Sequence, residues 1–179
     1  AGRAQQRRNS LMKHLYLIGG PMGVGKTTVC QQLKQTLPYS VFLDGDWCWD
    51  ASPFQVTPET RAMVLDNICH LLNNFLACTA YQNVVFCWVL HQQDIWDTIL
   101  GRLHLEGCAV HCVALTASEA ALRQRLEADI AAGRRTADVI PRSLARLPLY
   151  AALSARNIDT TGKTPAEVAA EIAQFGQTP

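Results

Sequence analysis

The stretch "GPMGVGKT", Gly20 to Thr27, decides the fold class of this chain. It matches the pattern G-x-x-x-x-G-K-[ST], and it lies between an apolar run at 14–19, "HLYLIG", and a helical pattern that begins at Lys26. The glycines let backbone N–H groups turn inward around an anion, where side chains would obstruct them. The helix that follows adds the positive end of its dipole. The stretch therefore predicts a phosphate-binding loop (P-loop) that holds a nucleoside triphosphate.

Two side chains of this loop carry chemistry. Lys26 can reach the β- and γ-phosphates, and the Thr27 hydroxyl can ligate Mg²⁺. ATP and Mg²⁺ are the expected cofactors. The alternative is a glycine-rich turn with an incidental lysine, which the position between a strand and a helix argues against. The expected nucleotide-binding residues are Gly20, Pro21, Met22, Gly23, Val24, Gly25, Lys26, Thr27 and Thr28.

Apolar runs alternate with helical patterns along the rest of the chain. Further strands are expected at 40–44, 83–90, 109–116 and 156–159. A long amphipathic helix is expected at 57–78, and another runs from Gln93 until Gly107 ends it. Thr116 and Glu119 form a capping-box pattern before the next helix, and Thr164 and Glu167 form the same pattern before the last one. This alternation predicts an α/β fold, a parallel sheet with helices on both faces.

Length and composition indicate one globular domain at 12–179, preceded at 1–11 by a processed leader or a cloning-derived tail. The chain has 179 residues, 49% hydrophobic and 17% charged, with a formal net charge of +1. This charge gives no reason to expect nucleic acid or an acidic membrane as a partner, and no apolar stretch is long enough to cross a bilayer. The expected state is a monomer or a homodimer.

The seven cysteines are scattered and form no C-x-x-C pair. Their number is odd, and most of them lie in apolar runs. Neither the cysteines nor the histidines show the spacing of zinc ligands. The pattern favours free, buried thiols and hence a reducing, cytoplasmic location.

The stretch "FLDGDWCWD", 42–50, places two carboxylates at the end of the second strand. Residues at the carboxyl ends of parallel strands open into the binding crevice, so Asp44 and Asp46 should face the phosphates. Either carboxylate can take a proton from an attacking hydroxyl, or hold Mg²⁺ through water. Gly45 is expected to bend the backbone so that both converge. Trp47 either walls an acceptor pocket or covers the core at the sheet edge.

GTPases are a poor match to the sequence. "DTTG" at 159–162 imitates a D-x-x-G switch, but it follows the last expected strand, and no N-K-x-D occurs. A small phosphotransferase fits better, one that passes the γ-phosphoryl group of ATP to an acceptor.

"LDGD" after the P-loop helix resembles the D-x-D or D-G-D pattern of small P-loop kinases: the adenylylsulfate, gluconate, shikimate and nucleoside monophosphate kinases. "LTASEAALRQRL" and "NIDTTGKTPAEVAAEI" resemble their later elements. The whole pattern most resembles small bacterial nucleotide-kinase-like ATPases, with tunicamycin-resistance and antibiotic phosphotransferases more distant. The resemblance implies a three-layer fold with five parallel strands in the order 2-3-1-4-5. In this chain the third strand lacks the terminal acidic residue that many P-loop enzymes use for Mg²⁺.

The segment at about 131–146 resembles the arginine-bearing lid of these kinases. Arginine forks stabilise the charge on a transferring phosphoryl group, whereas the alternative is a solvated helix face with salt bridges. Arg134 and Arg142 are the first candidates for catalysis, and Arg135 is as plausible as its neighbour. Arg125 is the next candidate and is expected at the nucleotide.

The acceptor side is less clearly marked. His91, at the end of the third strand, could hydrogen-bond the acceptor. Arg61, on the long helix, could hold an anionic group of the acceptor, because that helix forms part of the acceptor site in the relatives. Either residue could instead be structural or merely exposed. Asp46 and Trp47 complete the expected acceptor-binding set.

The expected activity is ATP- and Mg²⁺-dependent phosphoryl transfer to a small molecule: a nucleotide, a nucleoside, or a hydroxylated metabolite or antibiotic. The alternative is a regulatory or sensor protein that binds ATP and hydrolyses it slowly. A kinase acting on nucleic-acid 5′-hydroxyls is disfavoured by the near-zero net charge.

Overall fold

The computed structural model describes residues 12–177, so the segment predicted as a leader lies outside the described residues except for Met12. Its centre is a five-stranded sheet in the order β2-β3-β1-β4-β5, and every neighbouring pair is parallel. This confirms the α/β class and the strand order. The strands are β1 (Lys13–Gly19), β2 (Ser40–Asp44), β3 (Asn83–Trp88), β4 (Cys108–Thr116) and β5 (Arg156–Asp159).

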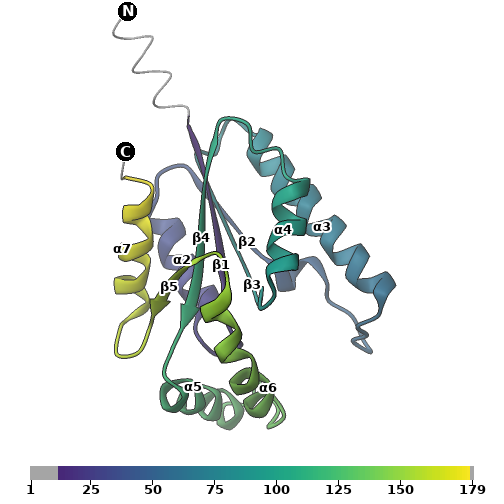
Figure 1. Ribbon diagram of the computed structural model, residues 1–179, viewed down its shortest axis with the longest axis vertical. Helices are drawn as coiled ribbons and strands as arrows, with labels where there is room; N and C mark the ends of the chain where they lie inside the picture. Colours follow the sequence, from purple (N-terminus) through teal and green to yellow (C-terminus); the bar gives the residue numbers. More distant parts are fainter. Residues whose placement is uncertain (1–11, 178–179) are drawn as a thin grey trace, which may run out of the picture.

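Helices cover both faces of the sheet and extend beyond one end of it (Figure 1). The helices are α2 (Lys26–Thr36), α3 (Pro58–Ala77), α4 (Gln93–Arg102), α5 (Glu119–Ala131), α6 (Val139–Arg146) and α7 (Pro165–Phe175). Two short 3₁₀ helices join them, η1 (Gly45–Cys48) and η2 (Leu147–Ala152). In Figure 1, α2 and α7 lie on one face, α3 and α4 on the other, and α5 and α6 lie past the carboxyl end of β4.

The continuous apolar strands are explained by a core on each face of the sheet. Tyr16 and Ile18 of β1 pack in the cluster that includes α2 and α7. Leu15 and Leu17 point the other way and pack with α3 and α4. A strand buried on both faces has no polar positions to alternate, so it reads as an unbroken apolar run.

The helix predicted to run to Gly107 ends five residues earlier, at Arg102. The side chain of Asn73 on α3 explains the early end. Its Nδ2 donates to the Arg102 carbonyl at 3.1 Å, and its Oδ1 accepts from the His104 backbone N–H at 2.8 Å. These bonds satisfy backbone groups that another helical turn would otherwise have paired. Gly107, with φ of 70°, forms the turn into β4 instead.

One predicted helix cap was wrong and another is confirmed. Thr116 belongs to β4, and the N-cap of α5 is Ser118, whose side chain accepts from the Ala121 backbone N–H at 3.2 Å. At α7, Thr164 and Glu167 form the expected capping box.

The described part of the chain contains no helix that is both long and apolar enough to span a bilayer. All seven cysteines fall within it, and all seven are free.

A histidine pair joins β1 to β4 away from the P-loop end of the sheet. His14 Nδ1 and His111 Nε2 share a hydrogen bond of 3.1 Å, and the two rings stack with centroids 5.4 Å apart. Tyr16 stacks on His111 at 4.7 Å. Burial, the charge of His14 and the charge of Arg156 lower the pKa of His111 to about 4. The pair is therefore held neutral in the folded protein near pH 7.

We expect this pair to make stability depend on pH between about 6.5 and 4. In that window unfolded His111 binds a proton that the folded state does not, so the free energy of unfolding falls as pH falls. After discounting for partial exposure, the loss is on the order of 1–2 kcal/mol. Urea unfolding of His111→Phe should show a flatter pH dependence than the unmodified protein, with His70→Gln on α3 as the control. An unchanged pH dependence in His111→Phe would contradict this account.

Candidate active site at the P-loop

The P-loop leaves the amino end of α2 open to an anion. Gly23 and Gly25 have φ of 85° and 99°, in the left-handed region that favours glycine. At Gly23 a side chain is also excluded sterically, because a Cβ would lie 2.4 Å from the side chain of Leu126. Gly25 is the N-cap of α2, which has no side-chain cap and no acidic residue in its first turn. The first amides of α2 are therefore unopposed by local carboxylates, as phosphate binding requires.

Lys26 folds back over the loop. Its Nζ donates to the Gly20 carbonyl at 2.8 Å and to the Pro21 carbonyl at 3.0 Å. Burial lowers the pKa of Lys26, and the nearby charges of Asp46 and Asp44 oppose that shift. The ammonium group thus lies among the P-loop carbonyls and within electrostatic range of both acids.

Asp44 ties β2 to the P-loop helix. Its Oδ2 accepts from the Thr27 hydroxyl at 2.7 Å, and its Oδ1 accepts from the Asp46 backbone N–H at 3.0 Å. Asp44 is buried, and each of its two carboxylate oxygens accepts one of these hydrogen bonds, as a buried polar group requires. The structure therefore places the acid pair beside the loop, with Asp44 in direct contact with Thr27.

Asp46 is the more available of the two acids. Its Oδ1 accepts from the indole Nε1 of Trp88 at 3.2 Å, and no described cation forms a salt bridge with it. Burial and the negative charge of Asp44 raise the pKa of Asp46. A carboxylate with a raised pKa and no paired cation is suited to accept a proton.

Gly45 is required for close packing, which differs from the bend predicted for it. Gly45 does not have a positive φ. A Cβ at this position would lie 2.6 Å from Cγ of Trp88. The Gly45 backbone lies against the indole, and the same indole holds Asp46. Trp88 lies inside the expected strand 83–90, which favours a core residue. In the structure it ends β3, packs in part against the core on the α3 face, and also lies at the site, partly exposed. Its position at a strand's carboxyl end was the signal that sequence reasoning could have used.

Two lid arginines share one carboxylate. Arg134 and Arg135 both donate to Asp129, with the shortest distances 2.9 Å and 3.1 Å. Burial alone would raise the pKa of Asp129, but the hydrogen bonds from these two guanidinium groups hold it below its usual range. The Arg134 side chain is 64% exposed, whereas that of Arg135 is 30% exposed.

Arg135 is the lid arginine whose charge acts on both Lys26 and Asp46, and it lowers the pKa of each. Arg142, ranked with Arg134 from the sequence, forms a salt bridge of 3.5 Å with Asp138, the N-cap residue of α6. Arg135 is thus the lid arginine whose charge acts at the proposed site. Catalytic roles for Arg134 and Arg142 stay predictions.

Arg125 joins the P-loop to the segment after β5. From α5 it donates to the Val24 carbonyl at 3.2 Å, to the Thr160 hydroxyl at 2.8 Å and to the Thr160 carbonyl at 3.0 Å. Thr160 in turn donates to the Thr116 carbonyl at 2.9 Å. Arg125 therefore braces the loop from behind. Its direct contact with a nucleotide stays a prediction.

His91 follows a strained residue at the end of β3. Leu90 has φ of 45°, a sparsely populated conformation for leucine, and its carbonyl accepts from the buried indole of Trp96 at 2.7 Å. His91 Nδ1 is enclosed and has no hydrogen-bond partner within residues 12–177. Burial and the charges of Arg146 and Arg61 lower the pKa of His91. Arg61 and His91 are thus brought into one neighbourhood, together with Arg146.

Trp47 lies apart from that neighbourhood. Its ring packs edge-on against Phe42 of β2 with centroids 5.1 Å apart, and 56% of the residue is exposed. Phe42 belongs to the core on the α2 face. This position favours the alternative that Trp47 covers the sheet edge.

Residues at the P-loop could supply part of the coordination sphere of a magnesium ion. No cluster of three or more His, Cys, Asp or Glu side chains occurs among residues 12–177, so a cage built wholly from protein is not expected. Mg²⁺ ordinarily keeps several waters and binds one or two protein oxygens together with substrate phosphates. The Thr27 hydroxyl and the Asp44 carboxylate, 2.7 Å apart, provide such oxygens.

Comparison with known proteins agrees with this geometry. A family described as an AAA domain matches residues 17–139, and the chain belongs to this family. No curated protein gives a significant match. The fold is similar to that of a tunicamycin resistance protein from Deinococcus radiodurans, with a TM-score of 0.68, 22% identity, and coverage of 93% of this chain and 97% of that one.

Two further solved structures have the same fold. A gluconokinase from Sinorhizobium meliloti 1021 has a TM-score of 0.64 and 19% identity, and the match covers 92% of this chain and 91% of that one. A shikimate kinase from Acinetobacter baumannii has a TM-score of 0.61 and 21% identity, and the match covers 96% of each chain. The resemblance to small P-loop kinases is confirmed. At these identities the likeness establishes the fold.

The contact between Trp88 and Asp46 predicts a linked titration. In ¹⁵N NMR spectra the Trp88 indole resonance should shift with the same midpoint as the Asp46 carboxyl, because the indole donates to it. The Trp96 indole, bonded to a backbone carbonyl, is an internal control that should not follow. Trp88→Phe removes the donor and should raise the pKa of Asp46 further, since that hydrogen bond lowers it. A Trp88 indole that ignores the titration, or an unaltered pKa of Asp46 in Trp88→Phe, would disprove the link.

Proposed function

We propose that this protein is an ATP- and Mg²⁺-dependent phosphotransferase that moves the γ-phosphoryl group to a hydroxyl of a small-molecule acceptor. The observation that carries the proposal is the arrangement of Lys26, Thr27, Asp44 and Asp46 around one loop. Asp44 is bound to Thr27, and no residue from 12 to 177 forms a salt bridge with Asp46. A protein that only binds ATP has no need for a carboxylate with a raised pKa beside its P-loop. The free cysteines suit a reducing compartment and support a cytoplasmic location.

Each residue has a distinct part in the proposed reaction. The P-loop amides and Lys26 bind the phosphates, and Thr27 with Asp44 would hold Mg²⁺, which neutralises phosphate charge when bound. Asp46 accepts the proton of the acceptor hydroxyl as its oxygen forms a bond to the γ-phosphorus. The bond from that phosphorus to the bridging oxygen breaks, and ADP leaves with those electrons. The phosphorylated acceptor and protonated Asp46 remain.

The lid arginines are proposed to stabilise the transferring group. Arg135 is the first candidate, because its charge already acts on Lys26 and Asp46. Movement of α5 and α6 toward the loop would bring Arg134 and Arg142 closer and exclude water, so that transfer outruns hydrolysis. His91 and Arg61, in the neighbourhood of Arg146, are proposed to hydrogen-bond the acceptor.

Replacing Lys26 tests the nucleotide site. Lys26→Ala should lower acceptor-stimulated ADP release at least about 100-fold, since it removes a charge that stabilises the transition state. The fold should survive, because the glycines and Arg125 shape the loop. ADP release is measured against a panel of nucleosides, nucleotides, sugars and aminocyclic antibiotics, with Lys34→Ala on the same helix as the control. Full activity in Lys26→Ala would refute the proposal, and no stimulation of the unmodified protein by any acceptor would favour the sensor alternative.

Replacing Asp46 separates chemistry from nucleotide binding. Asp46→Asn keeps the side-chain shape and the contact with Trp88 but removes the base, so turnover should fall about 100- to 10,000-fold. The affinity for a fluorescent ATP analogue should change little, because Asp46 is not assigned to the nucleotide. Asp97→Asn, at an exposed aspartate of α4, is the matched control. Loss of ATP binding with normal turnover of the residual complex would instead assign Asp46 to the nucleotide site.

A further inference from the structure

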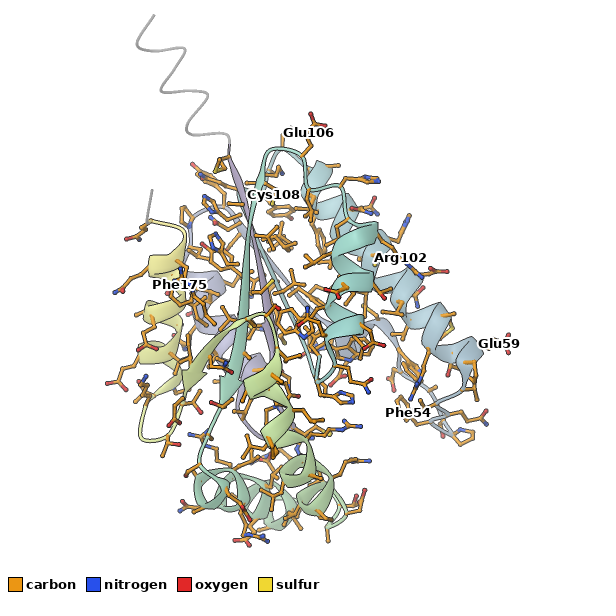
Figure 2. The ribbon with its side chains drawn as sticks, in the orientation of Figure 1. Phe54, Glu59, Arg102, Glu106, Cys108 and Phe175 are labelled. Atoms are coloured by element: carbon orange, nitrogen blue, oxygen red, sulfur yellow. The ribbon has the colours of Figure 1, made fainter. Side chains whose placement is uncertain are left out.

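An aromatic pair stands in the loop between η1 and α3. Trp49 and Phe54 stack with ring centroids 4.5 Å apart and planes 25° from parallel. Phe54 is 61% exposed, and Val56 and Met63 nearby in the chain are also exposed. Figure 2 shows Phe54 on the loop that projects beyond the start of α3, near Glu59. Exposed apolar side chains that lie together at the surface often mark a binding site. Here they lie beside the proposed active site, so we expect a ligand to cover them.

A hollow of about 540 Å³ lies at the base of this loop. Residues 48–53 line it together with Gln55, Thr60 and Met63. Its volume falls within the usual range for small-molecule sites, roughly 300–1,000 Å³. Asp50 is the one charged side chain in the lining, and no lysine or arginine lines it. The hollow therefore offers stacking and apolar contact, and it offers no partner for a phosphate or sulfate.

The walls of the hollow are held in place by hydrogen bonds. Thr60 donates from its hydroxyl to the Gln55 carbonyl at 2.9 Å, and Thr57 and Thr60 form a capping box at the start of α3. On the opposite end of the loop, Asn67 of α3 donates to the Cys48 carbonyl at 3.0 Å. Both ends of the loop are thus anchored to α3, so the aromatic pair is presented on a supported segment.

The 3₁₀ helix η1 connects the hollow to the acid pair along the chain. Cys48 lines the hollow and ends η1, two residues after Asp46. Burial raises the pKa of Cys48, and the charges of Asp44 and Asp46 raise it further. The hollow therefore has one lining residue, Cys48, that is two residues from the proposed base in the same 3₁₀ helix.

We propose that this hollow binds a flat, uncharged ring of the acceptor against Trp49 and Met63, while a hydroxyl of the same molecule is presented to Asp46. Phe54 lies outside the lining, and its stack holds the Trp49 indole in place. The acceptor class is thus a hydroxyl compound with an aromatic or similarly flat apolar portion. This inference rests on the proposed phosphotransferase function. Trp47, the tryptophan first expected to wall the acceptor pocket, is replaced in that role by Trp49.

A neutral apolar dye tests the hollow without any assumption about activity. N-phenyl-1-naphthylamine should bind saturably with a rise in fluorescence. Phe54→Ala should weaken binding about three- to ten-fold, because it removes the aromatic stack that positions Trp49 at the hollow. Tyr39→Ala is the matched control, since Tyr39 is an exposed aromatic residue before β2 and away from the hollow. Binding of an ATP analogue and thermal unfolding establish that each variant is folded. An absence of saturable binding, or equal binding to Phe54→Ala, would overturn the proposal.

A matched pair of acceptors separates this inference from the proposed function. Phenyl and methyl β-D-glucopyranoside carry the same sugar hydroxyls and differ in the flat ring. We expect the phenyl compound to displace the dye and to stimulate ADP release at least about ten-fold more in kcat/KM, a difference that Phe54→Ala should shrink. Equal stimulation by both compounds would overturn the hollow and leave phosphoryl transfer standing. Displacement of the dye, with no ADP release from either glucoside or from any acceptor of the panel, would support the hollow and count against phosphoryl transfer.

A second copy of the chain is the competing occupant. Sedimentation velocity over a range of protein concentrations decides between them. A dimer that Phe54→Ala dissociates, with dye binding lost as the dimer forms, would assign this surface to an interface and overturn the proposal. A sedimentation coefficient that Phe54→Ala leaves unchanged would support the small-molecule site.

Discussion

The hydrogen bond from Thr27 to Asp44, at 2.7 Å, is the contact on which the site depends. It joins the first turn of the P-loop helix to the carboxyl end of β2, which lies two strands away from β1 in the sheet. Because the sheet is parallel, both elements emerge at the same edge, and one short bond between them fixes the distance between phosphate loop and acid pair. Everything proposed about Asp46 follows from the position that Asp44 takes here.

The two acids divide the work because their surroundings differ. Asp44 is buried and its oxygens serve Thr27 and the Asp46 amide, so it is occupied in building the site. Asp46 is held by a neutral donor, the indole of Trp88, which orients it without supplying a compensating charge. Burial, and then the negative charge of Asp44, raise the pKa of Asp46. Trp88 ends β3, a strand without a terminal acidic residue in this chain, and its indole orients Asp46.

The fold could be predicted from the sequence because its signals are local and repeated. The P-loop, the buried strands and the Thr164–Glu167 capping box each depend on neighbours in the chain, and each is present as expected. The failures involve partners distant in sequence. Asn73 ends α4 from another helix, and Trp88 excludes a side chain at Gly45. Arg134 and Arg135 are adjacent in the chain and bind the same carboxylate, and they differ in how exposed the folded lid leaves their side chains. Local patterns do not contain such contacts.

The central claim is that Asp46 faces the γ-phosphate across a space that an acceptor hydroxyl fills. A crystal structure with Mg²⁺ and a non-hydrolysable ATP analogue measures this directly. The account predicts that Lys26 Nζ leaves the loop carbonyls for the phosphates, and that Asp46 stands off the γ-phosphorus with room for one hydroxyl about 3–3.5 Å from it. A γ-phosphate pointing away from Asp46, or Asp46 bound directly to the metal, would contradict the account.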